Sequence, residues 1–292
     1  MREYDEYKRI INTELDKVFS KWGGLIPEIL QNAMVYSLSA GGKRLRPVLL
    51  LAACESVNGC IDDAVPFACA LEMIHTYSLI HDDLPAMDND DLRRGKPTNH
   101  KVFGDAVAIL AGDGLLNAAA ELMCHASVKM DDLRGIRAAD TVLRRAGVTG
   151  MIAGQVMDVT QEGTELSDEK IAYIHQHKTA DLLTAPMEAG MIIGRASENM
   201  INSGRDYGYH LGMAFQLIDD ILDVTGDVAI LGKNTGTDPV HGKLTQVAYA
   251  GVEKTYEAAR DHIDIAVKAA SSFDTERGFF TKLARESLDR VC

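Results

Sequence analysis

HDDLPAMD at residues 81–88 and QLIDDILD at residues 216–223 are the two stretches around which the rest of this chain is organised. Each follows an apolar run typical of a buried helix, residues 67–80 before the first and 211–218 before the second. Carboxylates that follow buried helices so closely repel one another and need a compensating cation. The two stretches therefore predict two long core helices that end in acidic clusters.

The spacing within each stretch predicts which carboxylates act together. Asp219 and Asp223 are four residues apart, so an α-helix places them on one face. Asp82 and Asp88 are six apart, but Pro85 predicts that the helix loosens near residue 84 and returns Asp88 toward Asp82. A single such pair is more often a solvated helix end. Two clusters of hard oxygen ligands favour Mg²⁺, which keeps several waters and is completed by substrate phosphates.

The composition favours one all-α domain over residues 1–292. Apolar residues make up 46% of the chain, prolines number only 7, and no Ser/Gly/Pro-rich or single-charge run divides it. The net charge of −13 argues against nonspecific nucleic-acid binding. The five cysteines lack CxxC spacing, and most of them lie in apolar helical context, which indicates reduced core thiols. We expect a cytosolic protein without a signal peptide or stable membrane insertion, because no apolar run reaches about 18 residues.

Positive charge is concentrated at two places despite the acidic composition. Three cations follow a Gly-Gly pair and precede a predicted helix over residues 48–56, at Lys43, Arg44 and Arg46. Glycines let a ligand approach the backbone, and a helix start offers unpaired N–H groups to an anion. Two arginines suited to bidentate phosphate contacts follow the first acidic stretch, Arg93 and Arg94. The sequence predicts an anion site, and the diphosphate group fits it.

Several local features carry expectations about the helices. His75 lies seven residues before Asp82, two helical turns on the same side, so it could reach the same cavity. We expect residues 102–128 to form a helix that is interrupted at 112–114. Ser167 is a candidate cap for the next helix, and Pro186 is expected to kink that helix.

Together these motifs resemble those of the trans-isoprenyl diphosphate synthases, with the longer first acidic motif of bacterial farnesyl and plant-type geranylgeranyl enzymes. The resemblance covers about residues 36–247 and rests on the two acidic stretches, GGKRLRP at 41–47, GQVMD at 154–158, the Lys178-Thr179 pair and the segment with Lys233, GTD at 236–238 and Lys243. Position 180 is alanine where the resemblance leads us to expect glycine.

The resemblance implies a single-domain isoprenoid synthase helical bundle around a deep central cavity. It implies a prenyltransferase that condenses isopentenyl diphosphate with dimethylallyl or geranyl diphosphate to farnesyl diphosphate. About three Mg²⁺ per active site and a homodimer are also implied. Small-molecule prenyl diphosphates are the expected partners.

The resemblance also assigns roles to particular residues. The implied metal ligands are Asp82, Asp88 and Asp219, with Lys178 and Lys233 assisting catalysis. The implied site for isopentenyl diphosphate comprises Gly42, Lys43, Arg46, His75 and Arg94. The implied site for the allylic diphosphate comprises Arg93, Lys178, Thr179, Gln216, Lys233 and Lys243. The implied supporting groups are Asp83, Asp220, Asp223 and Gln155.

Tyr77 is a candidate chain-length gate. It stands five residues before Asp82, roughly 7.5 Å along a helix axis, where a growing prenyl chain would meet its ring. In similar enzymes a bulky aromatic here stops growth at farnesyl, whereas smaller residues allow geranylgeranyl. Ser78 beside it is small, so the floor could be incomplete. The alternative is that Tyr77 only packs in the core.

Four other functions compete with farnesyl diphosphate synthesis. A geranylgeranyl diphosphate synthase of the same family differs only in product length. A terpene cyclase shares the acidic motif but would not need a second diphosphate site at Lys43, Arg46 and Arg94. A phosphohydrolase built on His75 and His81-Asp82 leaves the Asp219 cluster unexplained. A non-catalytic partner subunit of a synthase would be expected to lose one acidic motif, and this chain keeps both.

Overall fold

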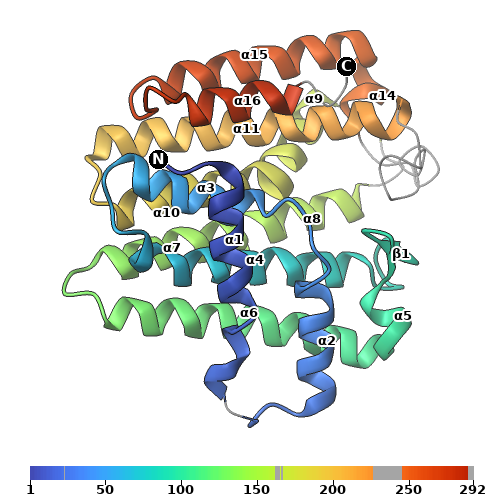
Figure 1. The fold of residues 1–292 in the computed structure, drawn as a ribbon. Coiled ribbons are helices and arrows are strands. Elements are labelled where there is room, and N and C mark those ends of the chain that lie inside the picture. Colours follow the sequence, from blue (N-terminus) through green and yellow to red (C-terminus); the bar gives the residue numbers. More distant parts are fainter. Residues whose placement is uncertain (23, 162–164, 166, 226–244, 289–292) are drawn as a thin grey trace.

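The computed structural model describes residues 1–22, 24–161, 165, 167–225 and 245–288, which form a helical bundle with one short hairpin (Figure 1). The all-α prediction is confirmed. In the first half the elements are α1 (Tyr4–Leu15), a 3₁₀-helix (Val18–Trp22), α2 (Glu28–Leu38), α3 (Leu45–Ser56), α4 (Ile61–Asp82), strands β1 (Leu92–Arg93) and β2 (Lys96–Pro97), α5 (Asn99–Phe103) and α6 (Asp105–Val128).

The second half is helical throughout its described part. Its elements are α7 (Arg134–Ala146), α8 (Met151–Thr160), α9 (Asp168–Ile174), a π-helical turn (His175–Ala180), α10 (Asp181–Ile193), α11 (Glu198–Thr225), α14 (Gln246–Ala250), α15 (Val252–Ala270) and α16 (Phe279–Leu288). Ser167 caps α9 as predicted, because its hydroxyl accepts a hydrogen bond from the backbone N–H of Lys170.

The helices stack in layers around two central elements, α4 and α10. α15 and α16 pack on α11, α11 packs on α10, and α10 packs on α3 and α7, while α4 packs on α3 and α6 (Figure 1). Every residue of α10 is buried, and α4 buries most of its length. Helices that are apolar on all sides belong in a core. The ends of α4 and α11 that carry the acidic stretches lie toward the same side of the bundle, near the hairpin (Figure 1).

One expectation about a helix break is wrong. α6 runs without interruption through residues 112–114, and the break comes earlier, at Gly104, whose φ of +82° favours glycine. α10 continues through Pro186, and a π-helical turn precedes it. The expected kink at Pro186 stays a prediction.

α6 is also the one helix in the described part of the chain that is long and apolar enough to cross a membrane. In its most apolar window, 39% of the residues are buried inside the bundle. A single helix of this kind is weak support for a membrane span, because a core helix passes the same test. The expected lack of membrane insertion therefore stays a prediction.

Candidate active site

The first acidic stretch forms a tight loop at the end of α4. The helix ends at Asp82, and the backbone N–H of Asp88 donates a hydrogen bond to the carbonyl oxygen of Asp82 at 2.9 Å. The backbone N–H groups of Met87 and Asn89 both donate to the carbonyl of Leu84. The predicted return of Asp88 toward Asp82 is confirmed at the level of the backbone.

Asp82 and Lys178 carry opposite charges, and each shifts the pKa of the other. Burial raises the pKa of Asp82 to about 6, with Asp88 raising it further and Lys178 opposing the shift. Burial alone would lower the pKa of Lys178, but Asp158 and Asp82 outweigh it and hold that pKa above its usual value. Lys178 donates to Asp158 at 2.5 Å. The ammonium therefore stays charged beside the first acidic cluster.

The carboxylates around Asp82 suit a shared cation. Across the residues that the structure describes, no three His, Cys, Asp or Glu side chains converge closely enough to hold a metal by themselves. Magnesium, however, usually takes one or two carboxylates and fills its remaining positions with water and substrate phosphate. Asp82 and Asp88 offer such a partial set. The raised pKa of Asp82 is a shift that an adjacent dication would reverse, so the residues fit.

The glycine loop and the hairpin meet at Arg94. Gly42 has a φ of +116°, and a side chain there would lie 2.7 Å from Cζ of Arg94. Arg94 itself has a φ of +54°, and its guanidinium donates to the carbonyl of Gly41. Glycine at position 42 thus lets the arginine lie over the loop. Lys43 is exposed beside it. The structure brings together the two cationic segments that the sequence predicted.

Arg46 and His75 form the buried side of this cationic region. Nη1 of Arg46 lies 3.3 Å from Nε2 of His75. Burial lowers the pKa of Arg46 to about 10, although Glu72 and Asp219 oppose the shift. Burial, followed by Arg46, lowers the pKa of His75 well below its usual value, so the imidazole is neutral. Nε of Arg46 is buried without a partner among the described atoms. An anion would satisfy that donor.

Arg44 corrects the expectation that three neighbouring cations face the ligand. It is buried, and its guanidinium donates to Glu72 at 2.6 Å and to the carbonyl of Leu38 at 2.7 Å. Its φ of +57° turns the side chain inward at the start of α3. Arg44 therefore anchors the glycine loop to α4 and leaves anion binding to its neighbours.

Arg93 is held in place by Asp83. Nε of Arg93 donates to Asp83 at 2.7 Å. Burial would lower the pKa of Arg93, but Asp83 and Asp82 outweigh it and raise that pKa, so the guanidinium is charged. Asp83 itself is buried in the loop.

The second acidic stretch ends α11. Asp220 is buried and accepts hydrogen bonds from Gln216 and from the backbone N–H of Gln246, both at 2.9 Å. Nε2 of His175 lies 3.2 Å from the same carboxylate. Asp219 is half-buried and Asp223 is buried one turn later. Asp220 therefore ties α11 to its neighbours, as a supporting group should.

An apolar cavity of about 640 Å³ lies below this polar rim. Its walls include Tyr77, Ser78 and Asp82 from α4, and Gln155, Lys178 and Thr179 from across the cavity. Thr179 donates to Gln216 at 2.6 Å, which links this wall to α11. Gln155 contributes a buried amide nitrogen without a partner among the described atoms. Gln155, expected only to support the site, borders the cavity itself.

Tyr77 borders a second cavity as well, together with Asp113, Leu116 and Ile152. It lines both the first cavity and a further one of about 410 Å³ between α6 and α7. Its hydroxyl is buried without a described partner, and burial raises the pKa of that hydroxyl to about 12. The gate role of Tyr77 stays a prediction. Ser78, in contrast, turns its hydroxyl to the carbonyl of His75 at 2.9 Å.

Sequence reasoning missed the groups that hold Tyr77. The ring of His81 packs edge-on against Tyr77, with centroids 5.7 Å apart. A side chain at Gly112 would lie 2.1 Å from Nε2 of His81, so α6 accommodates this ring only with glycine there. Asp113 borders both cavities. The signal was the glycine pair at 112–114, which marks a close approach rather than a helix break.

Two of the expected site residues cannot be placed. Lys233 and Lys243, with the segment between them, lie outside the described residues.

Comparison with known proteins decides the family. The polyprenyl synthetase family model matches residues 27–277. The chain belongs to the polyprenyl synthetase family. It is therefore a prenyltransferase, and this agrees with the motifs and the cavity described above.

Individual relatives of this polyprenyl synthetase differ in their product. It is 44% identical to the farnesyl diphosphate synthase of Geobacillus stearothermophilus over 277 residues, which cover 93% of this chain and 91% of that one. It is 48% identical to the large subunit 1 of a chloroplastic heterodimeric geranylgeranyl pyrophosphate synthase of Arabidopsis thaliana, over 86% of this chain and 69% of that one. The relatives leave the product length of this prenyltransferase open.

A solved structure shares the fold. A Helicobacter pylori geranyltransferase, complexed with magnesium and isoprenyl diphosphate, superimposes with a TM-score of 0.83 at 29% identity, over 99% of this chain and 97% of that one. The isoprenoid synthase bundle expected for this polyprenyl synthetase is confirmed.

Proposed function

We propose that this polyprenyl synthetase condenses isopentenyl diphosphate with dimethylallyl and geranyl diphosphate and releases farnesyl diphosphate. One observation carries the proposal: an apolar cavity of about 640 Å³ has charged groups at its rim and Tyr77 at its lower end. The rim fits two diphosphates, and the apolar interior fits a hydrocarbon chain and excludes the water that would quench a carbocation.

The two diphosphates would bind on chemically different sides of the rim. Asp82 and Asp88, together with Asp219, would hold magnesium and with it the allylic diphosphate. Magnesium, when bound, supplies the positive charge that favours departure of the diphosphate. A structural relative complexed with magnesium and isoprenyl diphosphate supports this assignment. Arg46, with its unused donor, and His75 would hold isopentenyl diphosphate without a metal.

Side chains of this chain complete the reaction. Lys178, kept charged by Asp158 and Asp82, would stabilise the negative charge that develops on the leaving diphosphate. Thr179, fixed by its hydrogen bond to Gln216, would border the allylic cation. The attacking double bond of isopentenyl diphosphate needs only orientation, which Arg46 and its neighbours provide. The final proton would leave to the released diphosphate.

Tyr77 supports farnesyl over geranylgeranyl as the product. Its side chain lines both the cavity of about 640 Å³ and the second one of about 410 Å³, so a chain that grows from the first cavity into the second would meet the ring. Geranylgeranyl diphosphate is the second candidate product. Relatives of similar identity carry that name, and the second cavity of about 410 Å³ would take the longer chain.

We also propose that the enzyme is a homodimer. Ile109, Ile152 and Val156 line the cavity, yet they are 44%, 37% and 54% exposed. Leu110, the next residue of α6, adds to this exposed apolar surface with 57% exposure. A second copy packed on this face would bury these side chains and close the cavity wall against water.

Product analysis tests the proposal directly. Purified protein is incubated with Mg²⁺, dimethylallyl diphosphate and labelled isopentenyl diphosphate, and the products are dephosphorylated and separated by chromatography. We expect farnesol as the main alcohol and no product when EDTA replaces the metal. Geranylgeraniol as the main alcohol would keep the condensation and refute the farnesyl assignment. No elongation with any primer would refute the proposal and favour the partner-subunit alternative.

A further inference from the structure

The π-helical turn His175–Ala180 carries two residues of the proposed allylic site, Lys178 and Thr179. A π-helical turn fits an extra residue into the helix and has poorer packing than an α-helical one, so it persists only where its surroundings favour it. Such turns recur at functional sites for that reason. What holds this turn therefore decides where the ammonium of Lys178 lies.

Backbone packing holds the turn on two sides. A side chain at Gly154 of α8 would lie 2.1 Å from the backbone nitrogen of Lys178, so α8 approaches the turn as closely as glycine allows. A side chain at Gly212 of α11 would lie 2.5 Å from Cα of Ala180. The alanine at position 180, which departs from the glycine expected there, is thus matched by a glycine on α11.

Polar contacts hold the cavity side of the turn. Lys178 donates to Asp158 and Thr179 donates to Gln216. These contacts involve residues already placed in the site or beside it. Neither contact involves Asp181, the residue that follows the turn at its C-terminal end.

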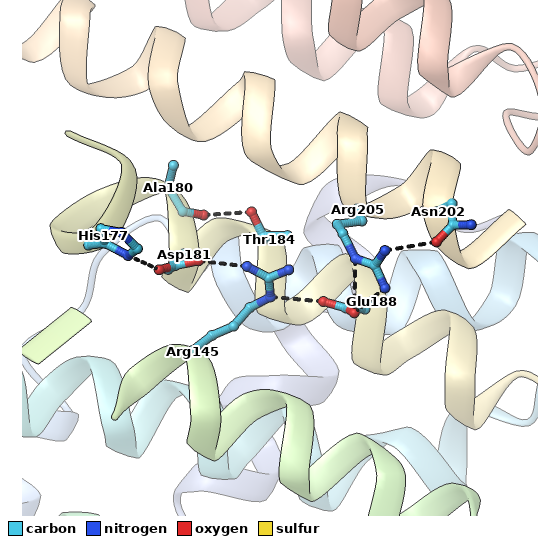
Figure 2. Close-up of polar contacts among 8 residues, drawn as sticks. All are labelled: Arg145, His177, Ala180, Asp181, Thr184, Glu188, Asn202 and Arg205. Atoms are coloured by element: carbon cyan, nitrogen blue, oxygen red, sulfur yellow. Dashed lines mark hydrogen bonds and ion pairs between the residues drawn. The ribbon is translucent and has the colours of Figure 1, made fainter. Parts of the chain in front are cut away.

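An ion-pair network holds that C-terminal side (Figure 2). One oxygen of Asp181 lies 2.8 Å from Nδ1 of His177 within the turn, and the other accepts from Arg145 of α7 at 2.6 Å. The same guanidinium donates through Nε to Glu188 at 2.8 Å. Arg145 therefore spans two carboxylates that are two helical turns apart on α10. Lysine lacks the rigid planar fork that fixes both contacts in direction.

The network continues away from the turn and ends at the surface. The second oxygen of Glu188 accepts from Arg205 of α11 at 2.7 Å, and Arg205 also donates to Asn202 (Figure 2). The side chain of Arg205 is 42% exposed, whereas those of Arg145 and Asp181 are 13% and 10% exposed. Burial would raise the pKa of Glu188, but hydrogen bonds from both arginines outweigh it and lower that pKa. The Glu188 carboxylate is therefore charged.

A buried network of this kind is a poor way to gain stability. The desolvation of two charges often cancels their attraction, and apolar residues of similar size frequently stabilise a core as well or better. A planar guanidinium fixed between two carboxylates does, however, define direction and distance. Here Arg145 holds the Asp181 carboxylate in the orientation in which it contacts His177 of the π-helical turn.

We propose that Arg145 and Asp181 are positioning residues that fix the π-helical turn and thereby the ammonium of Lys178 over the allylic diphosphate. The inference rests on the proposed function for its kinetic readout. Neither residue lines the cavity, so both act through the turn. Misplacement of a catalytic group by about 1 Å can cost about 100-fold in rate.

The matched control is Arg205, which pairs with the same Glu188 at the far end of the network. We expect Arg145→Lys and Asp181→Asn to lower kcat by about 10- to 100-fold with the KM for isopentenyl diphosphate changed less than about 3-fold. Arg205→Gln, which removes an ion pair of the same network, should leave kcat within about 2-fold of wild type. Equal kcat values in Arg145→Lys, Asp181→Asn and wild type would overturn the proposal.

Hydrogen exchange gives a second readout that needs no catalysis. Backbone amides of residues 175–180 should exchange about 10-fold faster or more in Arg145→Lys than in Arg205→Gln, because local opening of the turn becomes easier. If wild type makes no prenyl product, the proposed function fails and this comparison alone decides the positioning role. Equal exchange in the two variants would refute it. If Asp181→Asn does not fold, Arg145→Lys alone tests the positioning role.

Discussion

Replacing Asp82 by asparagine should stabilise the metal-free protein while it slows catalysis. Burial and the neighbouring Asp88 raise the pKa of this carboxyl from 3.8 to about 6. The folded chain therefore binds the proton more tightly than the unfolded chain does, so wild-type stability falls as the pH rises through the window from 3.8 to about 6. Asparagine keeps the shape of the side chain and removes the charge.

The size of the effect follows from the shift. A shift of about two pKa units corresponds to about 3 kcal/mol at most. Because the cavity is open to water, which screens the charge, we expect about 1–2 kcal/mol. For a chain of this length that raises Tm by roughly 2–5 °C. Turnover should fall by about two to three orders of magnitude, the scale of losing a group that stabilises charge in the transition state.

Thermal unfolding in EDTA at pH 7.5 and pH 5.0 measures the gain. The rise in Tm of Asp82→Asn over wild type should reach its full size at pH 7.5 and be clearly smaller at pH 5.0, where Asp82 of the folded wild type is largely protonated. Asp91→Asn is the matched control, since Lys101 lowers the pKa of this fully exposed carboxyl and no stabilisation is expected. An Asp82→Asn variant that unfolds at or below the wild-type temperature at pH 7.5 would show that the carboxylate is not strained in the metal-free state.

Four further outcomes are expected. Asp219→Ala should lose about two to three orders of magnitude in turnover, and near-normal steady-state rates would remove it from the metal assignment. Tyr77→Ser should lengthen the alcohol seen by chromatography after dephosphorylation; an unchanged product would rule out the gate. Arg46→Gln should raise the KM for isopentenyl diphosphate about 10- to 100-fold, and an unchanged KM would place that substrate elsewhere. Burial, followed by His210, lowers the pKa of His262 from 6.5 to about 4, so stability is lost as the pH falls through that window. His262→Gln should reduce this pH-dependent loss in the free energy of unfolding by about 1–2 kcal/mol, a figure that allows for solvent screening. Denaturant titrations at several pH values measure it, and an unaltered pH profile would contradict the prediction.

The parts of the site that are close in sequence were predictable. Apolar runs followed by acidic stretches predicted α4 and α11, and Pro85 predicted the return of Asp88 toward Asp82. These inferences rest on local periodicity and local sterics, which the sequence carries directly. The Gly42 loop was also predictable, since a glycine pair before three cations has few other uses.

What the sequence could not show depends on distant neighbours. Arg44 and Arg46 stand two residues apart and look alike, but only the left-handed backbone at Arg44 and the buried carboxylate of Glu72 decide that Arg44 turns inward. The π-helical turn has no signature of its own, because its residues suit an α-helix equally well. Gly112 predicted a break and marks a close approach to His81 instead.

The position of Tyr77 between two cavities bears on how such a chain can change in evolution. The space that a longer product would need already exists below the ring, bounded by α6 and α7. With Tyr77 as the proposed gate, a change of product would require a smaller side chain at that position rather than new volume in a packed core. The charged groups of the rim, including Asp82 further along the same helix α4, would stay as they are. Product length and chemistry would in this sense depend on different residues, some of them only a turn or two apart on one helix.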